Sequence, residues 1–425
     1  MASGSIFTHL MAGILALAGT CACQQGTGVL DWADYRGPSA DGHAATASVP
    51  LRWSESKNVT FKVRIRGRGW STPVIGHGRA WLTSARPDGH EMSVHAIDVK
   101  TGAVLVDRAL LEVEKPAKVN RLNSYASPSP VLDDKHVYLH FGTYGTFCLD
   151  AETAEEVWKR TDLRCDHMEG PGSTPILYED LLVFNVDGAD VQYVIALDKA
   201  TGETRWRTNR SVDLKKFPRD LRKAFSTPLV IEVDGEPRII SSGAEATVGY
   251  EPVTGREVWR VRHPGFSMSA RPLFSEGVLF LNTGFMRTQI YAVQAAGKGD
   301  VTEDNVVWKY RRSVPRMSSG LLVDGRYYMV SDGGIVTCLD PVKGQLIWKK
   351  RIGNEHSASP VFAGGRIYFF DREGRATVID PDSKGKILAT NKLASGFMAS
   401  PAVVGDAFLL RTKTHLYRIE NPVGR

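Results

Sequence analysis

Short apolar runs of about five residues recur along most of the chain, and turn-forming residues separate them. Two examples are residues 278–281 and 367–370, and neither run shows the spacing of an amphipathic helix. Runs of this length that are rich in β-branched and aromatic residues are typical of strands. The pattern therefore predicts an all-β fold.

A Ser/Thr-Pro step precedes many of these runs and marks the start of a repeat. Each start is followed by an apolar strand, a turn and a second apolar strand, and successive starts lie 40 to 57 residues apart. The eight starts centre on Pro73, Pro130, Pro175, Pro228, Pro272, Gly320, Pro360 and Pro401.

A second repeated signal is a tight turn that leads into a strand carrying tryptophan. Its fullest copy runs from Ala196 to Trp206. The Asp can accept hydrogen bonds from backbone N–H groups of its own turn, and the Gly supplies the positive φ of a bulged hairpin. The residues expected to form these structural turns and their docking contacts are Asp98, Gly102, Trp158, Asp198, Gly202, Trp206, Gly255, Trp259, Trp308, Asp340, Gly344 and Trp348.

A period of 40 to 57 residues with about four short strands per repeat is that of β-propeller blades. Eight starts predict eight blades, with a Trp filling the wedge between neighbours. The last repeat, which ends near Ile419, lacks an outer strand, and residues 58–63 form a spare strand before the first repeat. We therefore expect this early strand to close the ring by pairing into the last blade.

Composition supports one large globular unit. The chain has 425 residues, of which 42% are hydrophobic and 24% charged, with a net charge of +6 from mixed signs. These values exclude a disordered polyelectrolyte and argue against a dedicated nucleic-acid binder. Length alone would suggest two or three domains, but the repeats predict a single ring.

The N-terminus predicts export. Residues 1–30 contain no charged side chain, and residues 10–18 form an apolar run too short to span a bilayer. Small residues and two cysteines follow, so Cys23, or alternatively Cys21, is a candidate for lipidation as in a bacterial lipoprotein signal; simple cleavage is the alternative. We divide the chain into a signal segment (1–23), an N-terminal extension (24–57), a propeller (58–420) and a tail (421–425).

The complete turn at Ala196–Trp206 resembles the tryptophan-docking motif of pyrroloquinoline-quinone-type (PQQ-like) propellers, and Trp32-x-x-Tyr35-x-Gly37 is similar to the opening of that superfamily. The resemblance covers about residues 58–420. It implies one of two branches. One contains the quinoprotein dehydrogenases, and the other contains the shorter BamB-type outer-membrane assembly lipoproteins, which keep the propeller without cofactor or catalysis.

The dehydrogenase branch implies a Ca²⁺ held by Glu, Asn and Asp, an Asp base, cations for the quinone carboxylates and an adjacent pair of cysteines. The sequence has no adjacent cysteine pair. We therefore expect no cofactor and no metal site, with PQQ and Ca²⁺ reserved for the enzyme alternative.

Residues just before each first strand are expected to ring one mouth of the central channel. This candidate set for a ligand or partner leans cationic and comprises Arg68, Tyr125, Glu169, Lys223, Arg271, Arg316, His356 and Phe397. A walled cleft of this kind suits an anionic or polar ligand. Two long connections, residues 107–126 and 208–225, are further partner sites, and Pro218 is expected to start a short helix that leaves Arg219, Arg222 and Lys223 exposed.

The favoured interpretation is an exported, non-catalytic, BamB-like propeller that binds a protein of the bacterial cell envelope. It is expected in the periplasm or envelope, with a possible lipid anchor and no transmembrane helix. The alternatives are a quinone-dependent dehydrogenase of alcohols or aldose sugars, and a propeller that binds glycans or anions.

Overall fold

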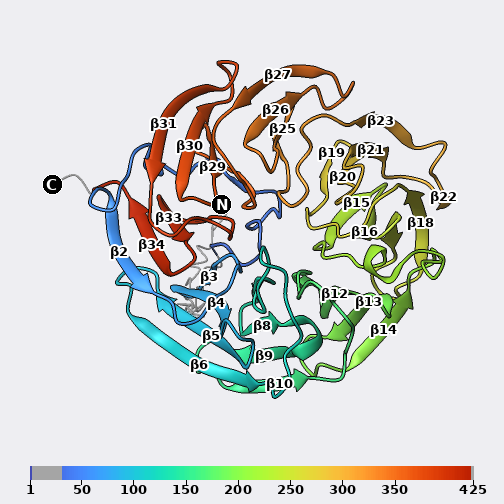
Figure 1. Ribbon diagram of the computed structural model, residues 1–425, viewed down its shortest axis with the longest axis horizontal. Helices are drawn as coiled ribbons and strands as arrows, with labels where there is room; N and C mark the ends of the chain where they lie inside the picture. Colours follow the sequence, from blue (N-terminus) through green and yellow to red (C-terminus); the bar gives the residue numbers. More distant parts are fainter. Residues whose placement is uncertain (2–30, 423–425) are drawn as a thin grey trace.

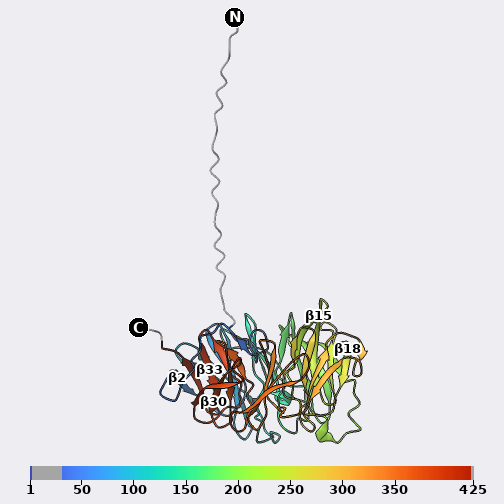
Figure 2. The same ribbon diagram turned by 90° about the horizontal axis from the view of Figure 1, so that it is seen from above.

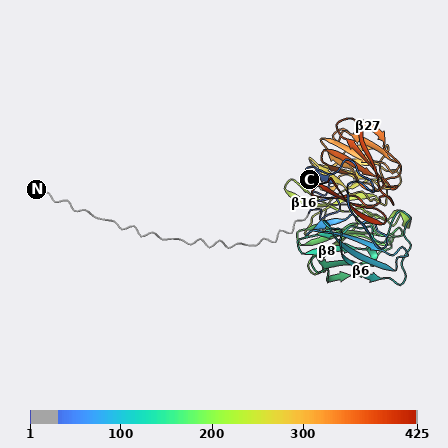
Figure 3. The same ribbon diagram turned by 90° about the vertical axis from the view of Figure 1, so that its left-hand side faces the viewer.

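The chain folds into a ring of eight small antiparallel sheets around a central axis (Figure 1). The computed structural model describes Met1 and residues 31–422. Edge-on, the ring is a thick disc (Figures 2 and 3). The predicted eight-bladed β-propeller is therefore confirmed. The predicted signal segment after Met1, with Cys21 and Cys23, lies outside the described residues.

The first four blades each follow the simple meander that the repeats predict. Blade 1 contains β3 (Val74–Gly76), β4 (Arg79–Ala85), β5 (Glu91–Asp98) and β6 (Val104–Glu112), and blade 2 contains β7 (Val131–Leu132), β8 (His136–His140), β9 (Thr146–Asp150) and β10 (Glu156–Arg160). Blade 3 contains β11 (Ile176–Tyr178), β12 (Leu181–Asp187), β13 (Gln192–Asp198) and β14 (Thr204–Asn209), and blade 4 contains β15 (Leu229–Val233), β16 (Glu236–Gly243), β17 (Ala246–Tyr250) and β18 (Glu257–Arg262).

The next three blades repeat the meander, with two additions. Blade 5 contains β19 (Leu273–Ser275), β20 (Val278–Asn282), β21 (Ile290–Gln294) and β23 (Val306–Tyr310), and its excursion β22 (Gly299–Asp300) pairs in parallel with β18 of blade 4. Blade 6 contains β24 (Leu321–Val323), β25 (Arg326–Val330), β26 (Ile335–Leu339) and β27 (Leu346–Arg351). Blade 7 contains β28 (Val361–Ala363), β29 (Arg366–Phe370), β30 (Arg375–Asp380) and β31 (Lys386–Lys392), and β1 (His43–Ala44) pairs in parallel with β28. The described residues also include two short 3-10 helices, η1 (Gly142–Tyr144) and η2 (Arg219–Leu221).

Blade 8 joins the two ends of the chain. It contains β32 (Ala402–Val404), β33 (Ala407–Arg411), β34 (His415–Glu420) and, as its outer strand, β2 (Val59–Arg64) from the N-terminal side. β2 pairs antiparallel with β34, with Val63 opposite Leu416. The predicted closure is confirmed, and it leaves no unpaired strand between the first blade and the last.

Every first strand begins within two residues of one of the eight predicted starts. The first three strands of each blade bury apolar side chains on both faces, because neighbouring blades stack against them. The outer strands alternate exposed and partly buried positions; β23, for example, exposes Val307 and Lys309. One end of each first strand therefore faces a narrow central channel, and the outer strands form the rim of the disc (Figure 1).

Candidate functional site

The residue before each start forms a ring of hydroxyl groups around the axis. Seven of the eight positions hold Ser or Thr. In six links, the backbone N–H at this position in one blade donates to the side-chain hydroxyl of the next blade. The links run from Thr72 to Ser129 (2.9 Å), Ser129 to Thr174 (3.0 Å), Thr174 to Thr227 (3.3 Å), Arg271 to Ser319 (2.9 Å), Ser319 to Ser359 (3.0 Å) and Ser359 to Ser400 (2.9 Å). The Ser/Thr-Pro repeat thus holds neighbouring blades together at the axis.

Two arginines act where a hydroxyl link is missing. Arg271 stands at the eighth position, and its Nε donates to the carbonyl of Pro228 in blade 4 at 2.9 Å. Between blades 8 and 1, the buried Arg411 donates to the carbonyl oxygens of Ser71 (3.0 Å) and Thr83 (2.8 Å). Arginine carries several fixed donors, so it can bridge two blades by itself.

The N-terminal segment, residues 32–37, runs through the channel along the first strands. Trp32 pairs with Ile75 of blade 1 through two backbone hydrogen bonds (3.0 and 2.8 Å), and the carbonyl of Ala33 accepts from Leu132 of blade 2 (3.0 Å).

The buried Arg36 of the same segment donates to the carbonyl of Gly320 in blade 6 (3.1 Å) and to that of Pro360 in blade 7. This segment therefore contacts first strands on both sides of the ring and fills the axis.

Local conformation lets the segment turn inside this narrow space. Gly37 has a φ of +84°, and a Cβ there would lie 2.9 Å from the ring of Trp32. Only glycine combines this backbone with such a close approach. The hydroxyl of Tyr35 lies 3.0 Å from that of Ser359, at the level of the hydroxyl ring. The Trp-x-x-Tyr-x-Gly opening is thus the part of the chain that closes one end of the channel.

A cavity of about 390 Å³ lies on the other side of this closure, on the axis. Its floor contains hydroxyl groups and Tyr35, and its walls carry aromatic and apolar side chains. The apolar members are Trp70, Leu122, Phe225, Phe266, Phe285, Met317 and Met398, and the hydroxyl-bearing members are Tyr35, Ser127, Ser129, Thr174, Thr227, Ser267, Ser269, Ser357 and Ser400. Such a cavity suits an amphipathic or largely apolar group.

The two long connections predicted as partner sites meet at this cavity. The first contributes Asn120 and Leu122, and the second contributes Lys223 and Phe225. As predicted, Pro218 precedes a short helical turn, η2. Loops held by a rigid scaffold are common binding sites, so the structure brings the two candidate loops into one surface.

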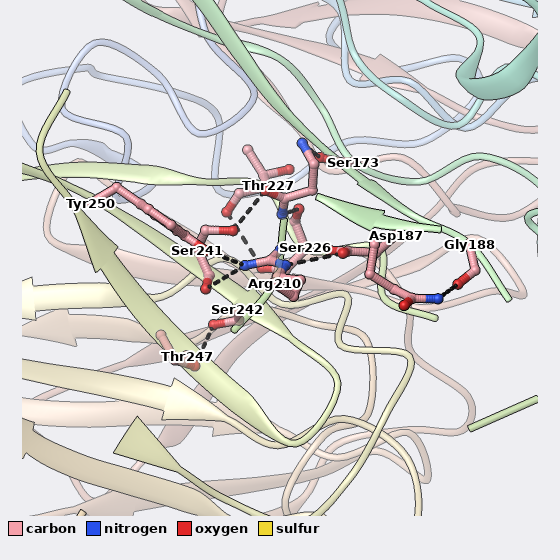
Figure 4. Close-up of polar contacts among 12 residues, drawn as sticks. Ser173, Asp187, Gly188, Arg210, Ser226, Thr227, Ser241, Ser242, Thr247 and Tyr250 are labelled. Atoms are coloured by element: carbon pink, nitrogen blue, oxygen red, sulfur yellow. Dashed lines mark hydrogen bonds and ion pairs between the residues drawn. The ribbon is translucent and has the colours of Figure 1, made fainter. Parts of the chain in front are cut away.

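A buried ion pair fixes the second connection (Figure 4). Arg210, where the connection begins, donates to both carboxylate oxygens of Asp187, at 3.0 and 2.5 Å. Burial alone would lower the pKa of Arg210, but the charge of Asp187 raises it above its ordinary value. The carbonyl of Asp187 then accepts from Ala224 at 3.2 Å, next to two cavity residues. This pair therefore positions Lys223 and Phe225.

The charged groups of the cavity are already engaged with one another. Lys223, whose side chain is 1% exposed, forms an ion pair with Asp220 and lies 3.9 Å from Glu169. Its Nζ also lies 5.5 Å from the ring centre of Phe266. Asn120 donates to the second oxygen of Glu169 at 2.6 Å. The exposure expected for Lys223 is therefore wrong, because two carboxylates and an aromatic ring cover it.

The eight predicted rim residues do not form one rim. Glu169 and Lys223 line the cavity. Beside it, the guanidinium of Arg68 stacks 4.8 Å from the ring centre of Trp70. The guanidinium of Arg316 is exposed and lies 5.4 Å from the ring centre of Phe285. The other four, Tyr125, Arg271, His356 and Phe397, are buried. Tyr125 donates to the carbonyl of Ala117, His356 bonds the carbonyl of Asn354, and Phe397 packs on Phe370.

The residues that line the cavity stand closer to each repeat start in the sequence than most of the predicted residues do. The residue three positions before the start lines the cavity in all eight blades, namely Trp70, Ser127, Gly172, Phe225, Ser269, Met317, Ser357 and Met398. Because side chains of an extended segment alternate between faces, the first and third residues before the start can face the channel together. Seven of the eight predicted residues stand four to six positions before a start, and of these only Glu169 and Lys223 line the cavity.

The docking residues lie on the opposite face of the disc, where third and fourth strands meet. Trp158, Trp206 and Trp308 donate from Nε1 to carbonyls in the turn of the next blade, at 2.9, 2.7 and 2.9 Å. Their rings pack on Gly202, Gly255 and Gly344, where a Cβ would clash, and Trp348 packs on Gly385. Within the turns, Asp98, Asp198 and Asp340 accept two backbone N–H groups each.

Four blade junctions depart from this docking pattern. The outer strands of blades 1 and 7, β6 and β31, contain no Trp. The closing strand places Phe61 on Gly102, so phenylalanine replaces Trp at the last junction. Trp259 is buried against Gly249 of its own blade, and its Nε1 has no partner among the described residues. The longer blade 5 excursion accounts for this, because it replaces the short turn that would supply an acceptor.

The cavity does not fit a calcium ion and a tricarboxylate quinone. Glu169, Asp220 and Asn120 are residue types that could bind Ca²⁺. However, the ammonium of Lys223 lies within ion-pair range of both carboxylates, where it would repel a calcium ion. It is also the one cation among the described lining residues, so the carboxylates of a quinone would have no free positive partner.

Comparisons with known proteins agree with this geometry. The family described as "Outer membrane protein assembly factor BamB" matches residues 20–208 and 190–425. The chain belongs to this family. Comparison with curated proteins finds no significant match.

Solved structures of BamB-like and enzyme propellers share the fold at low identity. BamB from Moraxella catarrhalis matches with a TM-score of 0.59 at 13% identity, over 85% of this chain and 99% of that one. A quinohemoprotein alcohol dehydrogenase from Pseudomonas putida matches with 0.60 at 14%, over 88% and 80%. A europium-containing methanol dehydrogenase matches with 0.53 at 14%, over 92% and 89%. In this BamB-like chain, no helix within residues 31–422 is long and apolar enough to cross a membrane.

Proposed function

We propose that this chain is an exported, non-catalytic BamB-like propeller that binds another protein of the cell envelope at the mouth of its axial cavity. The observation that carries the proposal is the meeting of both long connections at one concave, largely apolar mouth. The family description, an outer-membrane protein assembly factor, supports a role in the envelope.

The chemistry of the mouth suits a segment of a protein chain. Phe225, Phe266 and Phe285 offer flat aromatic surface, and Met317 and Met398 adapt to side chains of varied shape. Hydroxyl groups on the floor can bond main-chain or polar atoms that enter with them. A rigid wall with a few aromatic anchors is the usual composition of a binding hot spot.

Site-specific photo-crosslinking tests this role. A benzoylphenylalanine is placed at Leu122 or Met398 in the mouth, and at Val253 as a control, because Val253 is exposed in a docking turn on the opposite face. In cells, we expect the mouth positions to crosslink to a discrete envelope protein and the control position not to do so. Equal crosslinking from both faces would contradict the proposal.

The two alternatives have their own readouts. Saturable binding of pyrroloquinoline quinone with Ca²⁺, a quinone absorbance band and dye reduction with alcohols or aldoses would replace the proposal with an enzyme. Glycan-array binding that is lost in Arg316→Ala or Lys223→Ala would instead indicate a glycan- or anion-binding propeller.

A further inference from the structure

The outer strands of blades 5 and 6 carry an uncompensated positive charge. β23 and the two residues after it contribute Lys309, Arg311 and Arg312, and β27 contributes Lys349, Lys350 and Arg351. None of these six side chains forms an ion pair with a carboxylate of the described residues. We call them the cationic face.

Many cations in equivalent strands of other blades are compensated, although Arg108 of β6 and Arg207 of β14 form no ion pair within the described residues. On blades 2 to 4, Lys159 pairs with Glu156 at 3.1 Å, Arg205 with Asp198 at 2.9 Å, and Arg262 with Asp300 at 2.8 Å. β10 and β18 each begin with a glutamate, whereas β23 and β27 contain no acidic residue. The charge is therefore concentrated on one side of the disc.

The two strands that carry the cations are neighbours, and Lys350 turns the other way to donate to the carbonyl of Gly385 in blade 7 at 3.0 Å. Lys349 of β27 donates to the hydroxyl of Ser313 at 3.3 Å, and its Nζ lies 5.6 Å from the ring centre of Tyr310, so it reaches the end of β23. Figure 1 shows β23 and β27 as neighbours on the rim. The acidic residues that precede β23, Glu303 and Asp304, lie at its opposite end, about 15 Å away along the strand. Screening by these carboxylates is therefore weak.

Exposed apolar side chains accompany the cations. Val307 is 48% exposed on β23, and Leu346 and Ile347 are 50% and 48% exposed at the start of β27. Exposed apolar groups next to lysines and arginines are typical of surfaces that lie on a membrane, where cations meet lipid phosphates and apolar groups enter the interface.

We infer that the cationic face docks on the anionic lipid headgroups of a membrane surface. Lysines and arginines near such a surface add to one another's attraction for the lipid phosphates, so six of them suffice for reversible attachment at low ionic strength. This contact is separate from the protein-binding mouth, which lies at the axis. It would turn one edge of the disc toward the bilayer.

The test measures co-sedimentation of the purified protein with phosphatidylcholine vesicles that contain phosphatidylglycerol. The target variant is the triple K309Q, R312Q and R351Q, all exposed positions. The control is the triple K159Q, R205Q and R262Q, which changes net charge equally at compensated positions. Thermal unfolding checks that both variants fold. R312Q alone, whose side chain makes no hydrogen bond within the described residues, is a milder second variant.

We expect the wild type to bind anionic vesicles in a salt-sensitive manner and more strongly than vesicles of phosphatidylcholine alone. The target triple should weaken this binding at least about tenfold, R312Q should weaken it less, and the control triple should leave it nearly unchanged. Failure of the wild type to prefer anionic vesicles, or equal loss in both triples, would overturn the inference. Binding to polyglutamate without binding to vesicles would overturn it in favour of an acidic protein.

Discussion

Arg271 of blade 5 forms an ion pair with Asp34 of the N-terminal segment that fills the channel. Arg271 stands where the other seven blades hold Ser or Thr, so blade 5 exchanges a hydroxyl link for a contact with the segment. The side chain of Arg271 is 3% exposed and that of Asp34 is 19% exposed. This pair therefore couples the closure of the channel to the wall of the ring.

Removing the charge of Asp34 should destabilise the fold. Asp34→Asn leaves a buried guanidinium without its counter-ion, while an oxygen remains to accept from the N–H of Arg36. We expect a loss of about 2–3 kcal/mol in the free energy of unfolding, measured with urea. Asp88→Asn, in the exposed pair with Arg86, should leave the free energy of unfolding nearly unchanged. Equal losses in the two variants would contradict this account.

The hydroxyl ring around the axis predicts different effects on stability for two substitutions within it. Ser359→Ala removes the acceptor of the buried Ser319 N–H and the partner of Tyr35, and should cost about 1–3 kcal/mol. Thr72→Val is the matched change, because Thr72 Oγ1 is buried without a partner among the described residues, and should alter stability by less than about 0.5 kcal/mol. Urea unfolding measures both, and a costlier Thr72 variant would be evidence against the ring.

Two tryptophan variants distinguish the stability that comes from the docking hydrogen bond from the stability that comes from ring packing. Trp206→Phe loses the hydrogen bond to the carbonyl of Pro252 as well as ring area, whereas Trp259→Phe loses area alone. We expect the Trp206 variant to lose about 1 kcal/mol more in the free energy of unfolding. The prediction fails if the Trp259 variant is the less stable of the two.

Acid should weaken the fold through its buried histidines. Burial lowers the pKa of His263 to about 4, so the native state holds this ring neutral while the unfolded chain, with a pKa near 6.5, binds a proton. The contribution of the neutral His263 ring to the free energy of unfolding is therefore complete above about pH 6.5 and falls as the pH drops toward 4.

Between pH 7 and pH 5 this one group should account for about 2 kcal/mol of lost stability. His263→Gln should show a correspondingly smaller loss over that interval in urea unfolding. The fall should not vanish, since burial also lowers the pKa of His95 and His167 to about 4 and that of His140 to about 3. An unchanged pH dependence in the variant would refute the assignment.

Local signals carried the prediction of the fold. A Ser/Thr-Pro step and an Asp-to-Gly turn are each determined within a few residues, so all eight first strands and the closing strand could be located from the sequence. The excursion β22 could not, because its two residues pair with a strand of the neighbouring blade.

The site depends on contacts between distant segments and was predicted less well. Arg271 is buried because Asp34, 237 residues earlier, reaches it through the channel. Lys223 is covered because Glu169 and Phe266 come from two other blades. Alternation along each extended segment would have identified Trp70, Phe225, Met317 and Met398 as lining residues, but only once the orientation of the first strands was known.

The interlocking of the two chain ends constrains how the protein can be made. Residues 59–64 complete a sheet whose other strands span residues 402–420. The early strand therefore has no partner until translation is nearly finished. The earliest strand must therefore wait for its partner until most of the chain has been synthesised. A chaperone that holds it unfolded would shield it during that interval.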